Sequence, residues 1–349
     1  MRPDFSTIGG MYFHDLLDQP QAISDTVSGL ETSEAVRGLI ARIHRGEFRS
    51  LILTGMGSSL HGLIPLQLEL IQFGLPAILV ETSELIHHQT KLLSPDTLVV
   101  GVSQSGQSVE TIRLLDINQG KSPVLAITNT PESPLARRAD ASILTRAGKE
   151  HTVSCKTYVS TLAALRWLSD MVCNRDLQQS RKELEQAVPL AEDYLSRWET
   201  HLGGFVELLN GVRHLFLLGR GDSIAAALTG ALIIKESDHF HAEGMSCAAF
   251  RHGPFEMIRE ETFSLIFAGD KKTRDLNFGL LQDIREQKGR AELIGSDASL
   301  AACNLPDGPA SIQPILEILP IQMVTLALAF LAGREAGQFA FATKVTTKE

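Results

Sequence analysis

The chain has 349 residues, 44% of them hydrophobic, which is enough for about two globular domains with buried cores. A formal net charge of −9 and the lack of any basic block argue against a nucleic acid partner. Four widely spaced cysteines without a Cys-x-x-Cys pair predict neither a disulfide framework nor a zinc site. Residues 1–5 lack the apolar core of a signal peptide, and the apolar run near 319–331 is short for a bilayer, so we expect a cytoplasmic protein without a membrane partner.

The first half of the chain reads as helices followed by an α/β domain. Residues 1–45 are predicted to be an N-terminal helical segment, because no strand pattern occurs there. Within 46–165, apolar runs that alternate with helical patterns predict five buried strands, at 48–55, 76–80, 98–102, 124–128 and 141–144. Continuously apolar strands that alternate with helices indicate a parallel sheet covered on both faces.

The second half of the chain repeats the order of the first. A polar, helical stretch over 166–210 predicts a bridge to a second domain at 211–332. That domain begins with a predicted strand, a Gly-rich loop and a helix, and further strands are predicted at 263–268 and 291–294. A final apolar helix leads into a tail, 333–349. The repeated order predicts an internal duplication.

The loop after the third predicted strand is rich in small polar residues. Ser103, Gln104, Ser105 and Ser108 surround Gly106, directly before a predicted helix. Hydroxyls and backbone N–H groups at a helix N-terminus suit a phosphate or a similar tetrahedral anion. A single serine would more simply cap the helix, but this number of polar residues exceeds what a cap needs. The corresponding loop of the second half contains no serine, so the fold itself does not require them.

A second loop, after the first predicted strand, carries Ser58 and Ser59. Loops at the carboxyl ends of neighbouring parallel strands form the ligand site of an open α/β sheet. We therefore expect the two serine-bearing loops to lie side by side if their strands are neighbours.

Two side chains of the second half are candidates for proton transfer. Glu236 closes a predicted helix, and His252 follows sixteen residues later. A carboxylate with a raised pKa and a histidine are the usual acid–base groups near neutral pH, although a solvated helix glutamate and a turn histidine explain the same residues. The pattern of His239, His241 and Glu243 is a weak metal signal, and we expect no metal and no cofactor.

Taken together, these motifs resemble the sugar isomerase (SIS) family. The resemblance rests on the duplication, on the loops at 103–106 and 219–222, and on the motifs between 235 and 254. It also includes the Asp-Gln-Pro at 18–20 and covers nearly the whole chain. It implies an α/β protein of two tandem three-layer αβα SIS domains, each with a mostly parallel five-stranded sheet. A phosphorylated sugar is the implied ligand.

The resemblance also implies roles for individual residues. The phosphate would be held by the first-half loop, at Ser103, Gln104, Ser105 and Ser108, and the sugar would lie beside Ser58, Ser59 and Val153.

The implied catalytic residues lie further along the chain. Glu236 would carry a proton between C1 and C2, and Lys344, in a tail over the active site, would approach the sugar carbonyl. His252 would assist ring opening from the neighbouring subunit, so the implied active unit is a homodimer.

The sequence departs from the family's aminotransferase members in ways that bear on the reaction. Those members carry a glutamine-hydrolysing domain with an N-terminal cysteine, whereas here Met1 is followed by Arg2, so we expect no ammonia release from glutamine. Ile233 replaces a lysine one helical turn before the glutamate. The tail has Phe-Ala-Phe at 339–341, which predicts a more apolar pocket wall.

Three functions fit these features. The leading interpretation is an aldose–ketose isomerase that acts on a sugar phosphate through an enediol. The first alternative is a deglycase or deaminase of an amino-linked sugar phosphate, which uses the same proton transfer. The second alternative is a non-catalytic sugar-phosphate sensor.

Overall fold

The computed structural model describes residues 5–341 and 343–346, which form two compact units. The first-sheet unit comprises the described parts of Gln21–Glu150, Lys156–Glu185 and Ala342–Glu349. The second-sheet unit comprises those of Met1–Pro20, His151–Cys155 and Gln186–Phe341. The predicted helical segment, bridge and tail are thus each divided between the two units.

The first-sheet unit contains a parallel sheet in the order β2-β1-β3-β4-β5. Its strands, all at predicted positions, are β1 (Ser50–Gly55), β2 (Ala77–Glu81), β3 (Thr97–Val102), β4 (Val124–Thr128) and β5 (Ala141–Leu144). β1, β3 and β4 are buried at every residue, as expected for strands covered on both faces.

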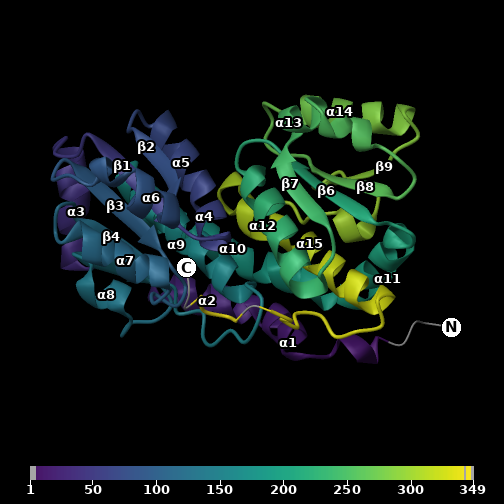
Figure 1. Ribbon diagram of the computed structural model, residues 1–349, viewed down its shortest axis with the longest axis horizontal. Coiled ribbons are helices and arrows are strands. Elements are labelled where there is room, and N and C mark those ends of the chain that lie inside the picture. The colour runs from purple at the N-terminus through teal and green to yellow at the C-terminus, as the bar shows by residue number, and fades with distance from the viewer. Residues whose placement is uncertain (1–4, 342, 347–349) are drawn as a thin grey trace. The chain divides into compact units, whose positions relative to one another are not determined.

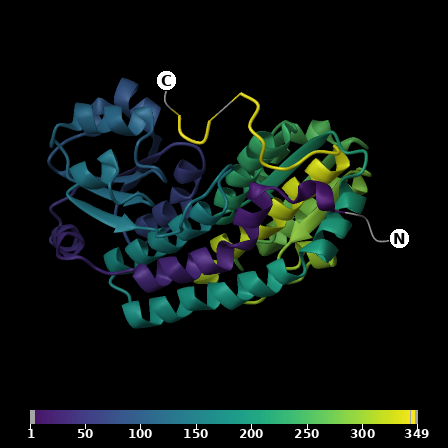
Figure 2. The ribbon, with the colours of Figure 1, turned by 90° about the horizontal axis from the view of Figure 1, so that it is seen from below.

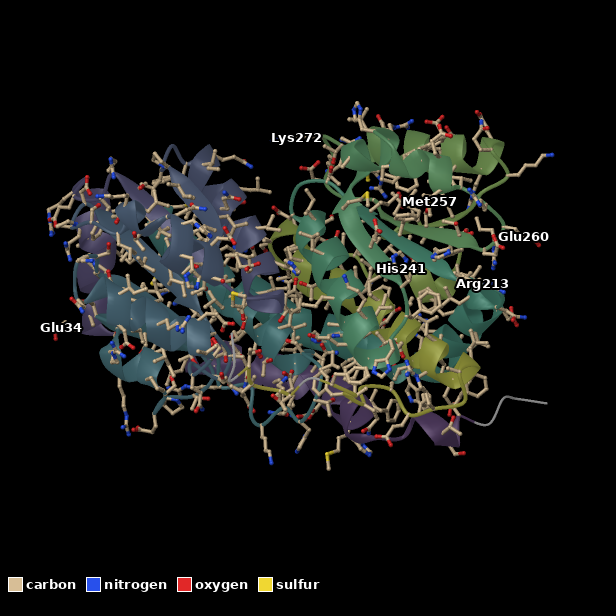
Figure 3. The ribbon with its side chains drawn as sticks, in the orientation of Figure 1. Glu34, Arg213, His241, Met257, Glu260 and Lys272 are labelled. Atoms are coloured by element: carbon tan, nitrogen blue, oxygen red, sulfur yellow. The ribbon has the colours of Figure 1, made fainter. Side chains whose placement is uncertain are left out.

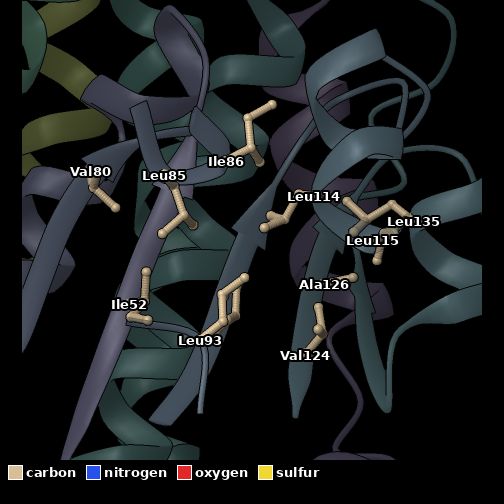
Figure 4. Close-up of a cluster of buried hydrophobic side chains, with 11 residues drawn as sticks. Ile52, Val80, Leu85, Ile86, Leu93, Leu114, Leu115, Val124, Ala126 and Leu135 are labelled. Atoms are coloured by element: carbon tan, nitrogen blue, oxygen red, sulfur yellow. The ribbon is translucent and has the colours of Figure 1, made fainter. Parts of the chain in front are cut away.

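Helices cover both faces of this sheet (Figure 1). One face packs against α6 (Thr82–His88), α7 (Val109–Asn118) and α8 (Pro134–Arg138). Figure 4 shows that core, where Ile52 and Ala126 of the sheet meet Leu85, Leu114 and Leu135 of the helices. The remaining helices of this unit include α3 (Glu34–His44), α4 (Ser58–His61), α5 (Leu63–Gln72) and α9 (Lys156–Val172), while α2 (Gln19–Gly29) and α10 (Leu177–Ser196) cross its boundaries.

The second-sheet unit repeats the architecture with a parallel sheet in the order β7-β6-β8-β9. The strands are β6 (His214–Gly219), β7 (Ala242–Ser246), β8 (Thr262–Phe267) and β9 (Arg290–Ile294). α12 (Ser223–Asp238) packs on the sheet, α15 (Gln313–Leu331) packs against α12, and α11 (Trp198–Leu209) packs against α15 (Figure 1). α13 (Cys247–Arg251) and α14 (Arg274–Glu286) contact the strands through a separate core. The three-layer α/β fold class is therefore confirmed in both units.

The second sheet has four strands in the described residues, not the five that we predicted. After β9 the chain makes a single parallel bridge between Gly295 and Asn304 and then continues through short 3-10 turns. Pro306 and Pro309 lie in this segment. A proline has no N–H to donate to a strand ladder, so the segment cannot continue as a paired strand.

β7 was not predicted as a strand, because its sequence Ala-Glu-Gly-Met-Ser has no β-branched residue and no apolar run. It is an edge strand beside β6. A side chain at Gly244 would collide with the backbone carbonyl of Ala227 in α12, so the strand packs this closely against the helix only because it has a glycine there.

The longest apolar helix, α15, lies in the core of the second-sheet unit, and 89% of its most apolar stretch is buried inside the protein. Figure 2 shows α1 (Met11–Leu17) beside it. Thr325 donates a hydrogen bond to the Tyr12 hydroxyl (3.2 Å), and the side-chain amides of Gln19 and Gln322 bond to each other (2.8 and 3.0 Å). Gln322, the polar residue of the apolar run, is thus satisfied inside the protein.

Candidate functional site

The two serine-bearing loops leave neighbouring strands, as predicted. β1 and β3 are adjacent, and the chain continues from β1 to the edge strand β2 on one side and from β3 to β4 on the other. This is the switch point of an open α/β sheet, where ligands bind beyond the carboxyl ends of the strands. A Cβ atom added at Gly55 would lie 3.0 Å from the Val102 carbonyl oxygen, so the two strand ends lie in close contact.

The serine loop, residues 103–108, is held by its own hydroxyls. The Ser103 Oγ accepts a hydrogen bond from the Gly106 N–H (3.2 Å), and the Ser105 Oγ accepts one from the Gln107 N–H (3.3 Å). A hydroxyl that accepts a backbone N–H still has its own proton to donate, which is what an anion requires. Gly106 has a φ of +65°, and a side chain there would collide with Ser133, so only glycine allows this turn.

The N-cap of helix α7 is Ser108, whereas Ser103 and Ser105 bond to N–H groups within the loop. The Ser108 Oγ accepts from the Thr111 N–H (3.4 Å) and lies 2.8 Å from the Thr111 hydroxyl. Ser58 and Ser59 begin the short helix α4 and are half-buried. The backbone carbonyl oxygen of Gln104 accepts hydrogen bonds from the Asn129 N–H (3.0 Å) and the Thr128 hydroxyl (3.1 Å). These bonds join the loop to the end of β4.

The C-terminal tail docks at the serine loop. The Thr346 carbonyl accepts a hydrogen bond from the N–H of Val109, the residue after Ser108 (3.2 Å). Lys344 forms an ion pair with Glu150, whose carboxylate also accepts from the Thr157 N–H (2.9 Å) and hydroxyl (2.7 Å). All of these groups belong to the first-sheet unit. The tail backbone thus contacts the start of α7 directly after the serine loop, and Glu150 holds the Lys344 ammonium two residues earlier in the tail.

The other predicted residues lie in the second-sheet unit. Glu236 is half-buried near the end of α12, where Ile233 of the same helix is fully buried. His252 is exposed at the C-terminal end of α13, and Val153 is buried. The Phe341 side chain is fully exposed, so it does not form the apolar wall that the tail sequence predicted. The predicted site residues therefore fall into two groups, one in each unit.

The weak metal pattern is a surface feature. His241 Nε2 lies 3.7 Å from the Glu243 carboxylate, and its Nδ1 lies 3.3 Å from the His214 Nδ1 (His241 is labelled in Figure 3). The described ranges, 5–341 and 343–346, contain no group of three His, Cys, Asp or Glu side chains placed to hold a metal ion.

The sequence analysis assigned no role to two carboxylates. One is Glu150, which anchors Lys344. Glu317 is buried in α15 and accepts a hydrogen bond from the Ser223 hydroxyl (2.7 Å), and its burial raises its pKa to about 8. A glutamate inside an otherwise apolar helix was the available signal, because a buried carboxyl needs a partner or a proton.

Comparison with known proteins gives a consistent family. The SIS domain model matches residues 48–169 and 208–332. The isomerizing glutamine–fructose-6-phosphate aminotransferase of Pyrococcus horikoshii is 30% identical over 334 residues, which cover 91% of this chain and 54% of that protein. The chain thus spans about half the length of this relative.

Two solved structures share the fold. Tagatose-6-phosphate ketose/aldose isomerase from Escherichia coli superposes with a TM-score of 0.80 at 20% identity, covering 99% of each chain. Glucosamine-6-phosphate deaminase from Thermotoga maritima superposes with a TM-score of 0.79 at 15% identity, covering 97% of this chain and 100% of the other. The tandem arrangement is therefore common to proteins named for different reactions.

Proposed function

Because the chain belongs to the SIS domain family, we propose that it is an enzyme that binds a phosphorylated sugar and isomerises it by moving a proton between C1 and C2. The observation that carries the proposal is the docking of the tail that contains Lys344 at the start of α7, directly after the serine loop and within one unit. It brings anion-binding donors and a carbonyl-polarising cation to one edge of one sheet.

Substrate binding begins at the phosphate. The hydroxyls of Ser103 and Ser105 keep their protons for donation, and the N-terminal end of α7 adds its positive dipole. Ser108 supports the loop as the cap of α7 while it lies at the same edge. The phosphate fixes one end of the sugar, so the carbonyl end is free to meet the catalytic groups.

The chemistry needs one base and one electrophile. Glu236 removes the proton from the carbon next to the carbonyl and returns it to the other carbon, while the hydroxyl proton moves between O1 and O2 of the enediol. Lys344 donates to the carbonyl oxygen, where negative charge develops. Glu150 holds the Lys344 ammonium in place through an ion pair whose carboxylate is itself anchored on Thr157.

His252 is proposed to act across a homodimer. Its side chain is exposed on the second-sheet unit, where a second copy of the chain can reach it. Mixing the inactive variants Glu236→Gln and His252→Ala tests this: in a mixed dimer, one site combines an intact Glu236 with the partner's intact histidine. We expect partial recovery of turnover on mixing. No recovery in a confirmed mixed dimer would overturn the shared site.

A deaminase or deglycase is the second candidate, and the shared fold of the Thermotoga maritima deaminase favours it. The same proton transfer at a carbon that bears nitrogen forms an imine, and water then releases the amine. A panel of hexose and 2-amino-hexose phosphates, followed by ¹³C NMR in D₂O, separates the two. Migration of the carbonyl with deuterium at C1 or C2 supports the isomerase, and release of ammonium or an amine supports the alternative. If every member of the panel stays unchanged, both proposals fail.

A further inference from the structure

The second sheet has a switch point of its own, between β6 and β8, and a cavity of about 660 Å³ opens there. It is lined by the loops after β6, β8 and β9 and by the first turns of α15. The position corresponds to that of the serine loop on the first sheet. The site described above makes no use of this cavity.

The frame of the cavity is fixed by buried contacts. A Cβ atom at Gly219 would lie 2.7 Å from the Ser223 carbonyl, the same tight approach that Gly55 makes after β1. Asn277 is fully buried, and its amide donates to the carbonyls of Phe267 and Ala268 (both 3.1 Å) while its oxygen accepts from Arg220 (2.9 Å). One side chain therefore ties the loops after β6 and β8 together, so the cavity is built into the fold.

Glu317 lines the cavity with a carboxyl that is only half satisfied. The residue is 5% exposed, and its Oε1 accepts from the Ser223 hydroxyl. Its Oε2 has no hydrogen-bond partner among the described residues. Buried polar atoms in folded proteins are nearly always bonded, so this oxygen indicates a missing partner.

The protonation state of Glu317 indicates whether its partner is a hydrogen-bond donor or an acceptor. Burial raises its pKa to about 8, so the carboxyl is mostly neutral at pH 7. Since Ser223 already donates to Oε1, the proton belongs on Oε2, a buried atom that can donate it only to a ligand oxygen that enters the deep end of the cavity.

Lysines line the same cavity. Lys271 and Lys272 are exposed on the loop after β8 (Lys272 is labelled in Figure 3), and no described carboxylate forms an ion pair with either. Asp270 of that loop is occupied, because it accepts from the N–H groups of Lys272 (2.9 Å) and Thr273 (3.0 Å). Asp222 and Asp307 also line the cavity, which therefore offers acceptors for hydroxyl groups as well as cations for an anion.

We propose that this cavity is a second ligand site, which takes a small hydroxylated molecule carrying a phosphate group. The lysines bind the phosphate, the carboxylates accept hydrogen bonds from the hydroxyl groups of the ligand, and Glu317 donates a hydrogen bond to a ligand oxygen at the deep end. The site is separate from the serine loop, so the proposal of a second site can be tested independently of the isomerase proposal.

The test uses the full-length Ser103→Ala/Ser105→Ala variant, whose first site is disabled. Isothermal titration at millimolar glucose 6-phosphate, glucitol 6-phosphate and glycerol 3-phosphate is expected to show binding of at least one. Adding Lys271→Ala/Lys272→Ala, or Glu317→Leu, is expected to weaken that binding at least tenfold. Glu317→Gln keeps a donor and is expected to retain it.

Unfolding temperatures check that each variant folds, and Glu317→Leu is expected to be no less stable, since it removes a half-satisfied buried carboxyl. No binding of the three phosphates, or binding that survives both lysine changes and Glu317→Leu, would overturn the second site. Turnover distinguishes this failure from that of the proposed function. Lys271→Ala/Lys272→Ala in an otherwise intact chain leaves the serine loop and Glu236 in place, so loss of isomerisation there would contradict the separation of the two sites.

Discussion

The switch points of the two sheets occupy the same place in the fold but carry different side chains. On the first sheet, serine hydroxyls line a glycine turn, and the chain's own tail brings Lys344 to it. On the second, lysines and a buried carboxyl border a cavity, and no serine occurs between β8 and α14. The sheet topology decides where a ligand can bind, and the loop residues decide which ligand and which reaction.

The proposed function assigns the proton transfer to Glu236, and removal of its carboxylate should have the largest effect. Glu236→Gln keeps the shape of the side chain but cannot accept the proton, so turnover is expected to fall ~10²–10⁴-fold with substrate affinity unchanged. Steady-state kinetics and isothermal titration measure the two quantities. Glu243→Gln, which alters an exposed carboxylate of β7, is the matched control and should leave turnover intact. Equal turnover in both variants would remove the assignment.

A pair of lysines, one at each switch point, separates the roles of the two sites. Lys344→Met removes the cation beside the serine loop and is expected to lower turnover roughly 10²-fold. Lys272→Met removes one of the cations that line the second cavity and should leave turnover unchanged. The ratio of kcat values is the measurement. A larger loss of turnover in Lys272→Met than in Lys344→Met would contradict the roles assigned to the two sites.

The serine loop should control affinity rather than chemistry. A hydrogen bond to a charged group contributes about 1.5–3 kcal/mol, so Ser103→Ala and Ser105→Ala should each weaken sugar-phosphate binding roughly 10- to 100-fold. Titration with the substrate measures this change, and Ser142→Ala in β5 is the control. Unchanged affinity in the double variant would show that the hydroxyls only shape the loop.

A last prediction concerns stability rather than turnover or affinity, and is a pH dependence specific to the second cavity. The pKa of Glu317 is raised from 4.5 to about 8, so the folded protein keeps a proton that the unfolded chain releases between these values. Its stabilising contribution is complete below 4.5 and is lost as the pH rises to 8, by about 1.4 kcal/mol per pH unit. Denaturant unfolding should show this slope in the wild type relative to Glu317→Gln. Parallel curves would contradict the buried neutral carboxyl.

Much of the fold could be predicted because its main strands are buried on both faces and therefore apolar throughout. Runs such as those of β1 and β3 are recognisable in the sequence, whereas their adjacency, on which the expected contact of the two loops depended, is a finding of the structure. β7 could not be predicted from its sequence, because an edge strand that packs against a helix through Gly244 needs no apolar run. The missing fifth strand depended on where two prolines fell, which a repeat argument overlooks.

From the residues alone, the candidate site could be predicted only where one loop contains it, and the roles of Glu236, His252 and Lys344 were implied by the family resemblance. The serine loop is local in sequence, so its residues could be recognised together. The pairing of Lys344 with Glu150 joins residues 194 positions apart, and the bond between Ser223 and Glu317 spans 94 positions. Such contacts depend on packing, which a pattern of neighbouring residues does not encode.

A structure of the protein with a bound sugar phosphate tests the central claim most directly. We predict the phosphate within hydrogen-bond distance of the Ser103 and Ser105 hydroxyls, with the sugar carbonyl directed toward Lys344. A phosphate bound only between Lys271 and Glu317, with the serine loop empty, would contradict the assignment of the substrate phosphate to the serine loop.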